Sequence, residues 1–454
     1  MSKLIETRPP SGFRDVPPAQ MLAKERVLDA ARRVYRSYGY APIDTPAAES
    51  LDVLLGKGGD ESDRLVYRVR GAKAEDAELG LRFDLTVPFA RFAAYHVALP
   101  EVGTPFKRYA MGPVWRGERP AKGRFREFWQ CDFDSIGTTS NSSDIEVALV
   151  VCDLFKALEI DGFELRVNNR LVLNGVLQSL GLADKSVPVL RALDKLDKGD
   201  RHKVIAELME AGADADQCER VLTLAAVRGS AREDNAAVLD RVAAEFGGNA
   251  LVAEGVRRLR ELVAGCEVAA DGRGSLTIDL SIARGLDYYT GTIYETVLTG
   301  DGLGQFGSVC SGGRYDNLAS LYTKQVLPGV GASLGVDRLL AAMEAMGHPW
   351  TRGGSSPAPV LVLQFDPARV ADYYRVAREL HAAGVGAEVF PEPKKLGQQF
   401  QYAEKRGHRL AVIAGPDEFA RGEWKLKDLA ARTEVVVPAA RLVDEVRRRL
   451  ATQQ

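Results

Sequence analysis

Strand-forming sequence stops near Asn168 and resumes near Leu276, and this interruption constrains the fold more than any other feature of the chain. The flanking residues are rich in hairpin patterns, in which apolar and polar side chains alternate between turn residues. Residues 171–266 are instead rich in Ala, Leu, Glu and Arg, with breaks at Gly181 and Gly199, and are predicted to be helical. The sequence therefore predicts an α+β domain on a mostly antiparallel sheet that contains a helical insertion.

A second domain follows a short linker. Residues 348–358 are rich in Gly, Ser and Pro, which is typical of a linker. From Val360 onward strands and helices alternate, so residues 359–454 are predicted to form an α/β domain with a parallel or mixed sheet. The first strand of this domain is followed by Phe365–Ala368, which contains no glycine, and this excludes a dinucleotide-binding loop.

Length and composition bound the class of protein. With 454 residues, 46% hydrophobic and 27% charged, the chain is long enough for two or three globular domains. The formal net charge of −2 creates no global field for nucleic acid, so RNA binding would depend on local basic patches. The cysteines are scattered and no signal peptide or long apolar run is present, which indicates a cytoplasmic protein. No Walker A sequence is present, so any ATP is held in another way.

One run of residues combines charges with strand-forming side chains. Residues 284–295 place Arg284, Asp287 and the phenols of Tyr288 and Tyr289 in a segment otherwise suited to a buried strand. Charged side chains are rarely buried unless they are paired or used in function. The run is therefore either a strand with an Arg284–Asp287 salt bridge or part of a functional site.

A second segment, residues 106–134, has the same mixed character and is predicted to form a strand, a turn and a second strand. Its central basic residues are Arg116, Arg119, Lys122, Arg124 and Arg126. Guanidinium groups match phosphate oxygens, so the segment suits contact with a polyanion. The aromatic residues Phe125, Phe128 and Trp129 interleave with these charges and suit base stacking. A solvated basic loop is the alternative.

Two glycine-rich segments lie further along the chain. The glycines of 329–335 are predicted to form a close turn into a helix, Val336–Met346, where Arg338 and the helix start would hold a phosphate. The same run fits a nucleophile elbow around Ser333. No adequate strand precedes it and no oxyanion-hole segment lies upstream, so a serine hydrolase is disfavoured. Ser308–Leu318 contains a glycine pair before Arg-Tyr-Asp, which indicates either backbone close to a ligand or a simple turn.

In this order, the segments resemble the motifs of class II aminoacyl-tRNA synthetases and, among them, the histidyl-tRNA synthetase family. Trp115–Glu118 together with Phe128 is similar to motif 2 of that class, and Gly329–Arg338 is similar to motif 3. The runs Arg284–Tyr289 and Ser311–Asp316 resemble the two signatures peculiar to the family. The resemblance extends over nearly the whole chain.

The resemblance implies a domain organisation and a reaction. The expected domains are a discontinuous class II catalytic domain (1–170 and 267–347), the helical insertion (171–266), the linker (348–358) and an anticodon-binding domain (359–454). The expected reaction is ATP-dependent activation of L-histidine to histidyl-adenylate, then transfer to the 3′ end of tRNA(His). ATP is the expected co-substrate and Mg²⁺ the expected metal, with ligands that the sequence does not identify. A cytoplasmic homodimer without membrane contact is expected.

The resemblance also implies roles for individual residues. The expected catalytic groups are Arg284 and Arg116. The expected histidine-binding residues are Asp84, Leu85, Thr86, Arg116, Gln130, Asp134, Arg284, Tyr288 and Tyr289. The expected ATP-binding residues are Arg116 at the α-phosphate, Glu118 near the adenine amino group, Phe128 stacked on adenine and Arg338 at the γ-phosphate. The expected contacts to the tRNA acceptor end are Arg119, Lys122 and Arg124.

A non-catalytic relative is the main alternative to a ligase. A paralogue that resembles these enzymes serves as the regulatory subunit of ATP phosphoribosyltransferase, and it needs neither the ATP-binding arginines nor a C-terminal tRNA-binding module. This chain retains Arg116, Arg284 and Arg338, and a module after Pro359, which favours the ligase.

Overall fold

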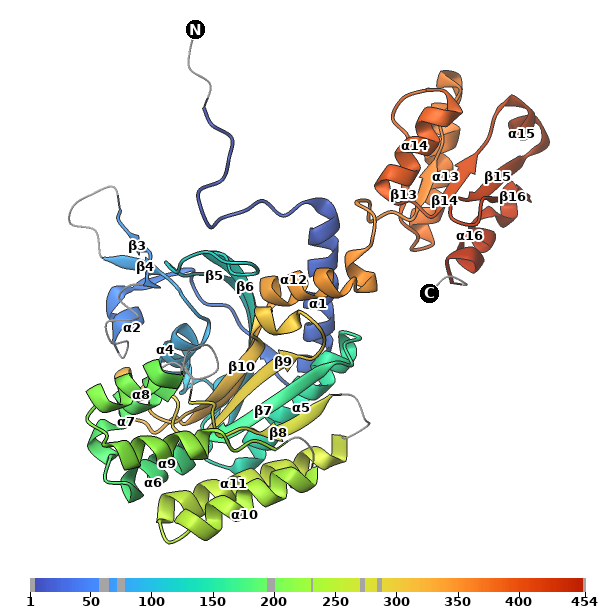
Figure 1. Cartoon of the computed structure of the whole chain (residues 1–454). Helices are drawn as coiled ribbons and strands as arrows, with labels where there is room; N and C mark the ends of the chain where they lie inside the picture. The colour runs from blue at the N-terminus through green and yellow to red at the C-terminus, as the bar shows by residue number, and fades with distance from the viewer. Residues whose placement is uncertain are drawn as a thin grey trace. The chain divides into compact units, whose positions relative to one another are not determined.

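The structure is a computed structural model that describes residues 5–56, 65–71, 78–193, 201–229, 232–269, 274–283 and 288–451 (Figure 1). The chain divides into two compact units. The larger unit comprises the described parts of 1–14 and 27–345, and the smaller unit those of 15–26 and 346–454. Residues 284–287, which include the predicted catalytic Arg284, lie outside the described residues.

Eight strands form the central sheet of the larger unit. They are β1 (Ala41–Pro42), β5 (Phe106–Trp115), β6 (Glu127–Ile136), β7 (Phe163–Asn169), β8 (Ser275–Ile278), β9 (Thr292–Leu298), β10 (Ser308–Tyr315) and β11 (Gly329–Gly335). Their order across the sheet is β1–β5–β6–β11–β10–β9–β7–β8. Neighbouring strands are antiparallel except the parallel pairs β1–β5 and β7–β8. The predicted mostly antiparallel sheet, and the predicted strand–turn–strand arrangement of residues 106–134, are confirmed.

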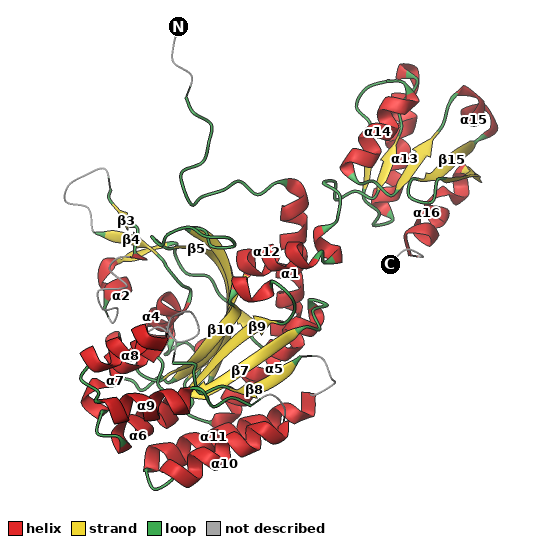
Figure 2. Ribbon diagram, in the orientation of Figure 1, coloured by secondary structure: helices red, strands yellow, loops and turns green. Residues whose placement is uncertain are grey.

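A set of helices separates β7 from β8 in sequence, as the composition of this stretch predicts. They are α6 (Arg170–Ser179), α7 (Ser186–Leu193), α8 (Arg201–Glu210), α9 (Ala215–Ala225), α10 (Arg232–Phe246) and α11 (Ala250–Cys266). They gather beside the β7–β8 edge of the sheet, where α10 contacts β8 and α11 contacts β7 (Figures 1 and 2). Side-chain oxygens of Asn169, Asp214 and Asn249 cap α6, α9 and α11, which explains where these helices begin.

One face of the central sheet is covered by α5 (Asn141–Ala157) and by the part of α1 (Pro18–Ser37) that belongs to the larger unit. Tyr35 of α1 donates a hydrogen bond to the Cys131 carbonyl of β6 at 3.1 Å. On the same side, Tyr294 of β9 donates to the Asp144 carbonyl of α5 at 2.7 Å. The opposite face, called the front face below, is the one on which the candidate site is built.

The remaining elements of the larger unit lie around the β5–β6 hairpin and after β11. They are the small sheet β2 (Ala48–Ser50), β4 (Leu79–Leu81) and β3 (Arg68–Val69), with α2 (Leu51–Leu55), α4 (Thr86–His96) and α12 (Val336–Met346). Helix α12 has the predicted bounds. Helix α4 begins directly after Asp84 and Leu85, so its first turn presents Thr86 next to two predicted site residues.

The glycine run 329–335 is strand β11 and not the predicted turn. It pairs with β6 on one side and β10 on the other. A Cβ atom at Gly331 would lie 2.2 Å from Asp134 Oδ1, and one at Gly329 would lie 2.3 Å from the Tyr315 ring. The glycines are therefore needed because neighbouring side chains cross closely over this strand, which is a recognised use of glycine inside a sheet.

The smaller unit contains a five-stranded mixed sheet in the order β13–β12–β14–β15–β16. Its strands are β12 (Val360–Val362), β13 (Ala387–Val389), β14 (Leu410–Ile413), β15 (Glu423–Asp428) and β16 (Thr433–Pro438). Its helices are α13 (Val370–Ala382), α14 (Leu396–Arg406), α15 (Pro416–Arg421) and α16 (Leu442–Ala451). Strands β13, β12 and β14 are mutually parallel, whereas β15 and β16 are antiparallel, so the predicted α/β alternation is confirmed.

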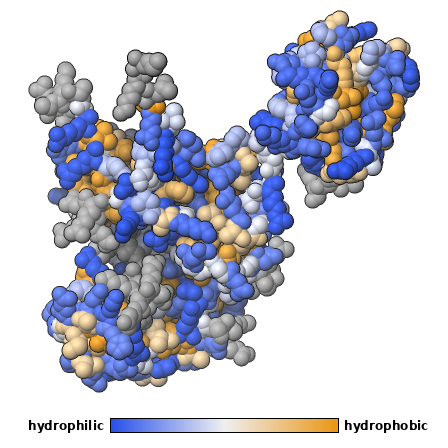
Figure 3. All heavy atoms as spheres, turned by 45° about the horizontal axis from the view of Figure 1, so that its top comes forward, coloured by the Kyte–Doolittle hydropathy of each residue, from blue (hydrophilic) through white to orange (hydrophobic). Residues whose placement is uncertain are grey.

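The surface drawn in Figure 3 is largely hydrophilic, with apolar side chains in small patches. This distribution is ordinary for a folded globular chain. Among the helices that the structure describes, none combines the length and the apolar character needed to cross a membrane.

Candidate active site

Strand β6 carries a row of polar side chains on the front face of the sheet. Phe128, Gln130, Asp132 and Asp134 share this face because successive residues of a strand point to opposite sides. Gln130, Asp132 and Asp134 are only 7%, 1% and 2% exposed. Carboxylates buried in the middle of a sheet destabilise a fold unless they are paired, so this row marks a candidate site.

Asp134 is paired with an arginine that the sequence patterns did not single out. Arg108 lies opposite Asp134 on β5, is completely buried, and forms an ion pair with Asp134 Oδ2 at 2.7 Å. The hydroxyl of Tyr315 donates to Asp134 Oδ1 at 2.5 Å. Burial raises the pKa of Asp134, and the Arg108 guanidinium and the Tyr315 hydrogen bond oppose that rise.

Arg108 also connects this pair to the start of α4. Its Nη2 donates to the Leu85 carbonyl at 2.9 Å, and its guanidinium lies 4.4 Å from the centre of the Phe89 ring. The predicted site residue Leu85 therefore contributes its backbone oxygen, while its buried side chain packs with Ala110. A basic residue within a strand gives little signal in a single sequence, which is why Arg108 was missed.

Asp84 and the two adjacent tyrosines form the next part of the site. Asp84 accepts a hydrogen bond from the Val87 backbone N–H at 3.0 Å, and Tyr288 donates to its other oxygen at 3.5 Å. The Tyr288 ring lies 5.0 Å from the Tyr289 ring and 5.9 Å from the Tyr315 ring. Burial raises the pKa of Asp84 and of both tyrosines. The fold thus brings together residues that are far apart in sequence.

Thr86 and Gln130 complete the group predicted around an amino acid. Gln130 donates from Nε2 to the Ser333 hydroxyl at 2.8 Å, and Thr86 approaches Asp132 Oδ2 at 3.5 Å. Asp132 was not predicted as a site residue, although it lies between Gln130 and Asp134 on the same face. Burial is the main cause that raises its pKa to about 7.

Small residues form the part of the front face beside this row. Ser333 pairs with Asp132 on one side and with Ser311 of β10 on the other. Ser311 is exposed and Ser333 is half-buried, although both strands are otherwise largely buried. The nucleophile-elbow alternative fails here, because Ser333 lies inside a paired strand and its hydroxyl accepts from Gln130.

Arg116 and Phe128 meet at the other end of the β5–β6 hairpin. The Arg116 guanidinium lies 5.2 Å from the centre of the Phe128 ring, and its Nε donates to the Phe83 carbonyl at 2.9 Å. Both side chains are half-buried, as is Glu118, whose carbonyl accepts from Arg126 at 3.2 Å. This end of the site therefore offers a positive charge beside an aromatic surface.

Arg338 lies at the start of α12, and the β5–β6 turn reaches the same helix. A Cβ at Gly123 of the turn would lie 3.7 Å from the Arg338 Cα. The Arg338 guanidinium donates to the Ser308 carbonyl. Among the turn residues predicted to contact RNA, Arg119 and Lys122 are exposed and Arg124 is half-buried. Lys122 lies 5.4 Å from the centre of the Phe306 ring.

The N-terminal segment holds this turn in place through Arg14. Arg14 donates to Asp337 Oδ1 at 2.7 Å, and the other Asp337 oxygen accepts from the Trp129 backbone at 2.7 Å. The Arg14 guanidinium also lies 4.0 Å from the centre of the Phe125 ring. That Phe125 stacks on a base stays a prediction, and only the ring face opposite the guanidinium would serve for it.

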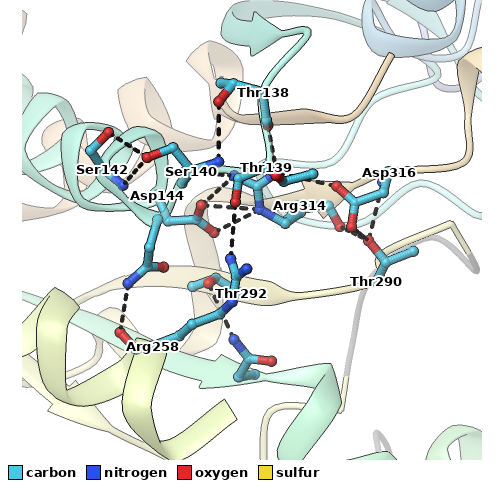
Figure 4. A network of polar contacts seen from close by, with 12 residues as sticks. Thr138, Thr139, Ser140, Ser142, Asp144, Arg258, Thr290, Thr292, Arg314 and Asp316 are labelled. Atoms are coloured by element: carbon cyan, nitrogen blue, oxygen red, sulfur yellow. Dashed lines mark hydrogen bonds and ion pairs between the residues drawn. The ribbon is translucent and has the colours of Figure 1, made fainter. Parts of the chain in front are cut away.

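The Ser308–Leu318 segment contains a structural arginine. Arg314 is 2% exposed and forms an ion pair with Asp144 at the start of α5, and Asp316 accepts from Thr290 at 2.7 Å (Figure 4). A Cβ at Gly312 would meet the β11 backbone at 2.1 Å, and one at Gly313 would meet the Tyr289 ring at 2.8 Å. The close approach inferred from the glycine pair is thus made by the protein itself.

The donor set of the site is poorly suited to a metal ion. Within the described residues, no group of three or more His, Cys, Asp or Glu side chains is arranged to hold a metal ion. The front-face carboxylates Asp84 and Asp134 are engaged by Tyr288, Arg108 and Tyr315 instead. The described residues therefore do not form a protein cage for Mg²⁺.

Known protein families, sequences and structures resemble this chain over most of its length. A family model for histidyl-tRNA synthetase matches residues 12–339, and one for an anticodon binding domain matches residues 360–449. A histidine–tRNA ligase from Rhodopirellula baltica is 51% identical over 430 residues, which are 94% of this chain and 95% of that protein. The crystal structure of histidyl-tRNA synthetase from Nostoc sp. PCC 7120 has a TM-score of 0.86 and 34% identity, and the match covers 98% of this chain and 100% of that one.

These matches place the chain among the aminoacyl-tRNA synthetases. It belongs to the histidyl-tRNA synthetase family, which confirms the resemblance carried by its motifs. A Bacillus halodurans structure described as an ATP phosphoribosyltransferase regulatory subunit/histidyl-tRNA synthetase matches with a TM-score of 0.72 and 20% identity, over 88% of this chain and 97% of that one. At that identity the match shows a shared fold.

Proposed function

We propose that this protein is a histidine–tRNA ligase, which activates L-histidine with ATP to histidyl-adenylate and then transfers the histidyl group to the 3′ end of tRNA(His). Its family membership supports the reaction. The observation that carries the proposal is the meeting of Asp84, Asp134, Tyr288 and Tyr289 on one face of the sheet, beside Arg116 and Phe128. Such a site offers acceptors to an amino acid and a cation to a nucleotide.

The amino acid would lie over the front face of β6. Asp134, Tyr288 and Tyr289 are the proposed contacts to the imidazole ring, and Asp84, Thr86 and Gln130 are the proposed contacts to the amino group, next to the Leu85 backbone. Because these polar groups would be left buried and unpaired by an apolar analogue, the pocket should reject isosteres that cannot form hydrogen bonds.

The nucleotide would lie at the Arg116 end of the site. We assign Phe128 to stacking on adenine, Glu118 to the adenine amino group, Arg116 to the α-phosphate and Arg338 to the γ-phosphate; these assignments follow the family motifs. Attack of the histidine carboxylate builds negative charge on the α-phosphate, and fixed guanidinium groups stabilise that charge. Arg284 is the proposed catalytic arginine. Because the described residues offer no cage of their own, Mg²⁺ would be held mainly through the phosphates.

The tRNA would contact three parts of the chain. Arg119, Lys122 and Arg124 on the β5–β6 turn are the proposed contacts to the acceptor end, and the helical insertion 171–266 would lie against the acceptor arm. The unit after the linker would bind the anticodon, in agreement with its match to an anticodon binding domain.

We also propose the domain boundaries that the sequence predicts, and that the protein is a homodimer. A cytoplasmic location fits the five cysteines, all described, which form no disulfide.

The decisive experiment is histidine-dependent ATP–pyrophosphate exchange by the purified chain, followed by charging of tRNA(His). A ligase catalyses both, whereas a regulatory subunit of ATP phosphoribosyltransferase catalyses neither. The high identity to a named ligase, against 20% to the Bacillus halodurans structure, favours the ligase. Absence of exchange with purified protein shown to be folded by its cooperative thermal unfolding would overturn the proposal.

A further inference from the structure

Three buried acceptor atoms on the front face of β6 have no hydrogen-bond partner among the residues that the structure describes, and one of them, Asp134 Oδ2, has an ion pair with Arg108 instead. The other two, which have neither, are Gln130 Oε1 and Asp132 Oδ1. Asp132 is 1% exposed, and two residues further along the strand lies Asp134 on the same face. Buried polar atoms are almost always paired in folded proteins, so two neighbouring exceptions call for a partner that the chain itself does not supply.

Asp132 also has no ion-pair partner among the described residues, whereas the carboxylate beside it does. Arg108 forms its ion pair with Asp134, at 2.7 Å. The hydroxyls of Thr86 and Ser333 approach Asp132 from α4 and β11. The Arg108 guanidinium is near enough to favour the charged form of Asp132 but forms no ion pair with it. A buried carboxylate whose direct hydrogen bonds come only from hydroxyl groups is unfavourable for folding, and such a group is retained where a ligand cation completes it.

The face next to Asp132 has space for a ligand. Its cross-strand neighbours are Ala110 on β5 and Ser333 on β11, both small side chains. The next residue across the sheet, Ser311, is exposed. Solvent therefore reaches the front face close to Asp132, although the carboxylate itself is covered.

We propose that Asp132 binds the α-ammonium group of the amino acid substrate, together with Asp84, Thr86 and the Gln130 side-chain carbonyl oxygen. This inference rests on the proposed function and adds a specificity residue to it. An ammonium group carries a positive charge and three N–H donors, which match one unpaired carboxylate oxygen and one unpaired amide oxygen. Asp134 cannot serve the same group equally well, since Arg108 and Tyr315 already engage it.

The test uses the full-length protein and the substitution Asp132→Asn, which keeps the shape and removes the charge. Binding of L-histidine, L-histidinol and imidazole propionate is measured by calorimetry; the last compound lacks the ammonium group. The variant is expected to bind L-histidine and L-histidinol about 10- to 100-fold more weakly than the wild type. Binding of imidazole propionate is expected to change by no more than about twofold, because this compound has no ammonium group and so makes no contact with Asp132 in the wild type.

Stability of the ligand-free protein distinguishes binding from a structural role. The same change at Asp144, which is buried and ion-paired with Arg314, is the matched control and should lower the melting temperature. Asp132→Asn should leave the melting temperature unchanged or raise it, because an unpaired buried charge is removed. If Asp132→Asn does not fold, Asp132→Ser serves in its place.

The pH dependence of stability supplies a second readout. The charged and titratable groups near Asp132 are Arg108, Asp134, Asp84, Tyr289, Cys310 and Tyr35, together with the hydroxyls of Thr86 and Ser333. Since the folded-state pKa of Asp132, about 7, is above that of an unfolded chain, the folded protein binds the extra proton. Wild-type stability relative to Asp132→Asn should therefore rise as the pH falls from about 8 to about 5.

Two outcomes would overturn the inference while leaving the proposed function intact. One is an Asp132→Asn protein that binds L-histidine as tightly as the wild type. The other is an equal loss of affinity for L-histidinol and imidazole propionate, which would place Asp132 at the imidazole ring. Failure of the wild type to catalyse histidine-dependent exchange would instead overturn the proposed function, so the two failures are distinguishable.

Discussion

Two arginine–aspartate pairs are almost fully buried among the described residues of the larger unit, and their surroundings differ. Arg314 donates from Nε and Nη2 to Asp144, and from Nη1 to the Thr138 carbonyl at 3.0 Å and to Asp316 at 3.1 Å. All three nitrogens of this guanidinium are used (Figure 4). The pair ties β10 to the start of α5 and leaves no hydrogen-bonding capacity for a ligand.

Arg108 and Asp134 form the contrasting pair. Arg108 uses only Nη2, which faces both Asp134 and the Leu85 carbonyl, and within the described structure its Nε and Nη1 have no hydrogen-bond partner. The two ion pairs are of the same type. The guanidinium of the structural pair, Arg314, uses all its hydrogen-bond donors, whereas that of the pair at the site, Arg108, does not. Between these two pairs, incomplete hydrogen bonding distinguishes the pair at the candidate site from the structural one, whereas the presence of buried charge does not.

Removing the saturated pair should have the largest effect on folding. Asp144→Ala leaves Arg314 buried without its carboxylate, so the free energy of unfolding is expected to fall by about 3–5 kcal/mol. Denaturant titration measures this loss. Asp29→Ala on α1, which removes an exposed carboxylate paired with exposed Arg32 one turn along the helix, is the control and should change the value by less than about 1 kcal/mol. An unchanged midpoint for Asp144→Ala would show that the pair does not support the fold.

A catalytic arginine should show the opposite pattern. Arg284→Ala is expected to lower the rate of ATP–pyrophosphate exchange by about 10²–10³, through the loss of transition-state stabilisation. Its unfolding midpoint should stay close to that of the wild type. Exchange near the wild-type rate would remove Arg284 from the catalytic group.

Replacing Asp134 should weaken the binding of histidine. Asp134→Ala is expected to raise the KM for histidine by about 10- to 100-fold, because a charged hydrogen-bond acceptor is lost. The KM for ATP should change far less. Steady-state exchange kinetics at varied histidine and ATP measure both constants, and equal changes in the two would separate Asp134 from the imidazole contact.

The smallest effect is expected on the exposed turn between β5 and β6. Lys122→Ala should raise the KM for tRNA by about 2- to 5-fold and make charging less sensitive to salt, without any change in exchange. Lys156→Ala on α5 is a surface control that should change neither. An altered exchange rate in Lys122→Ala would place this lysine in the nucleotide site.

Local sequence patterns specify much of this protein. The alternation along 127–136 puts Gln130 and Asp134 on one face, and the alternation of strands and helices after Val360 defines the second unit. Helix α12 has the bounds that its composition predicts. These features depend on the period of apolar residues and on the turn residues between them. Both are local signals that can be read from a short stretch of sequence.

Long-range packing decides which of these groups are paired and which are not. Arg108 became a candidate because it pairs with Asp134, and Asp132 because one of its buried oxygens has no partner among the described residues. Arg314 became structural because of Asp144, 170 residues away in sequence. The glycines of β11 became strand residues because Asp134 and Tyr315 cross over them. Burial and hydrogen bonding of this kind depend on contacts between distant segments, which the periodicity of a single segment does not contain.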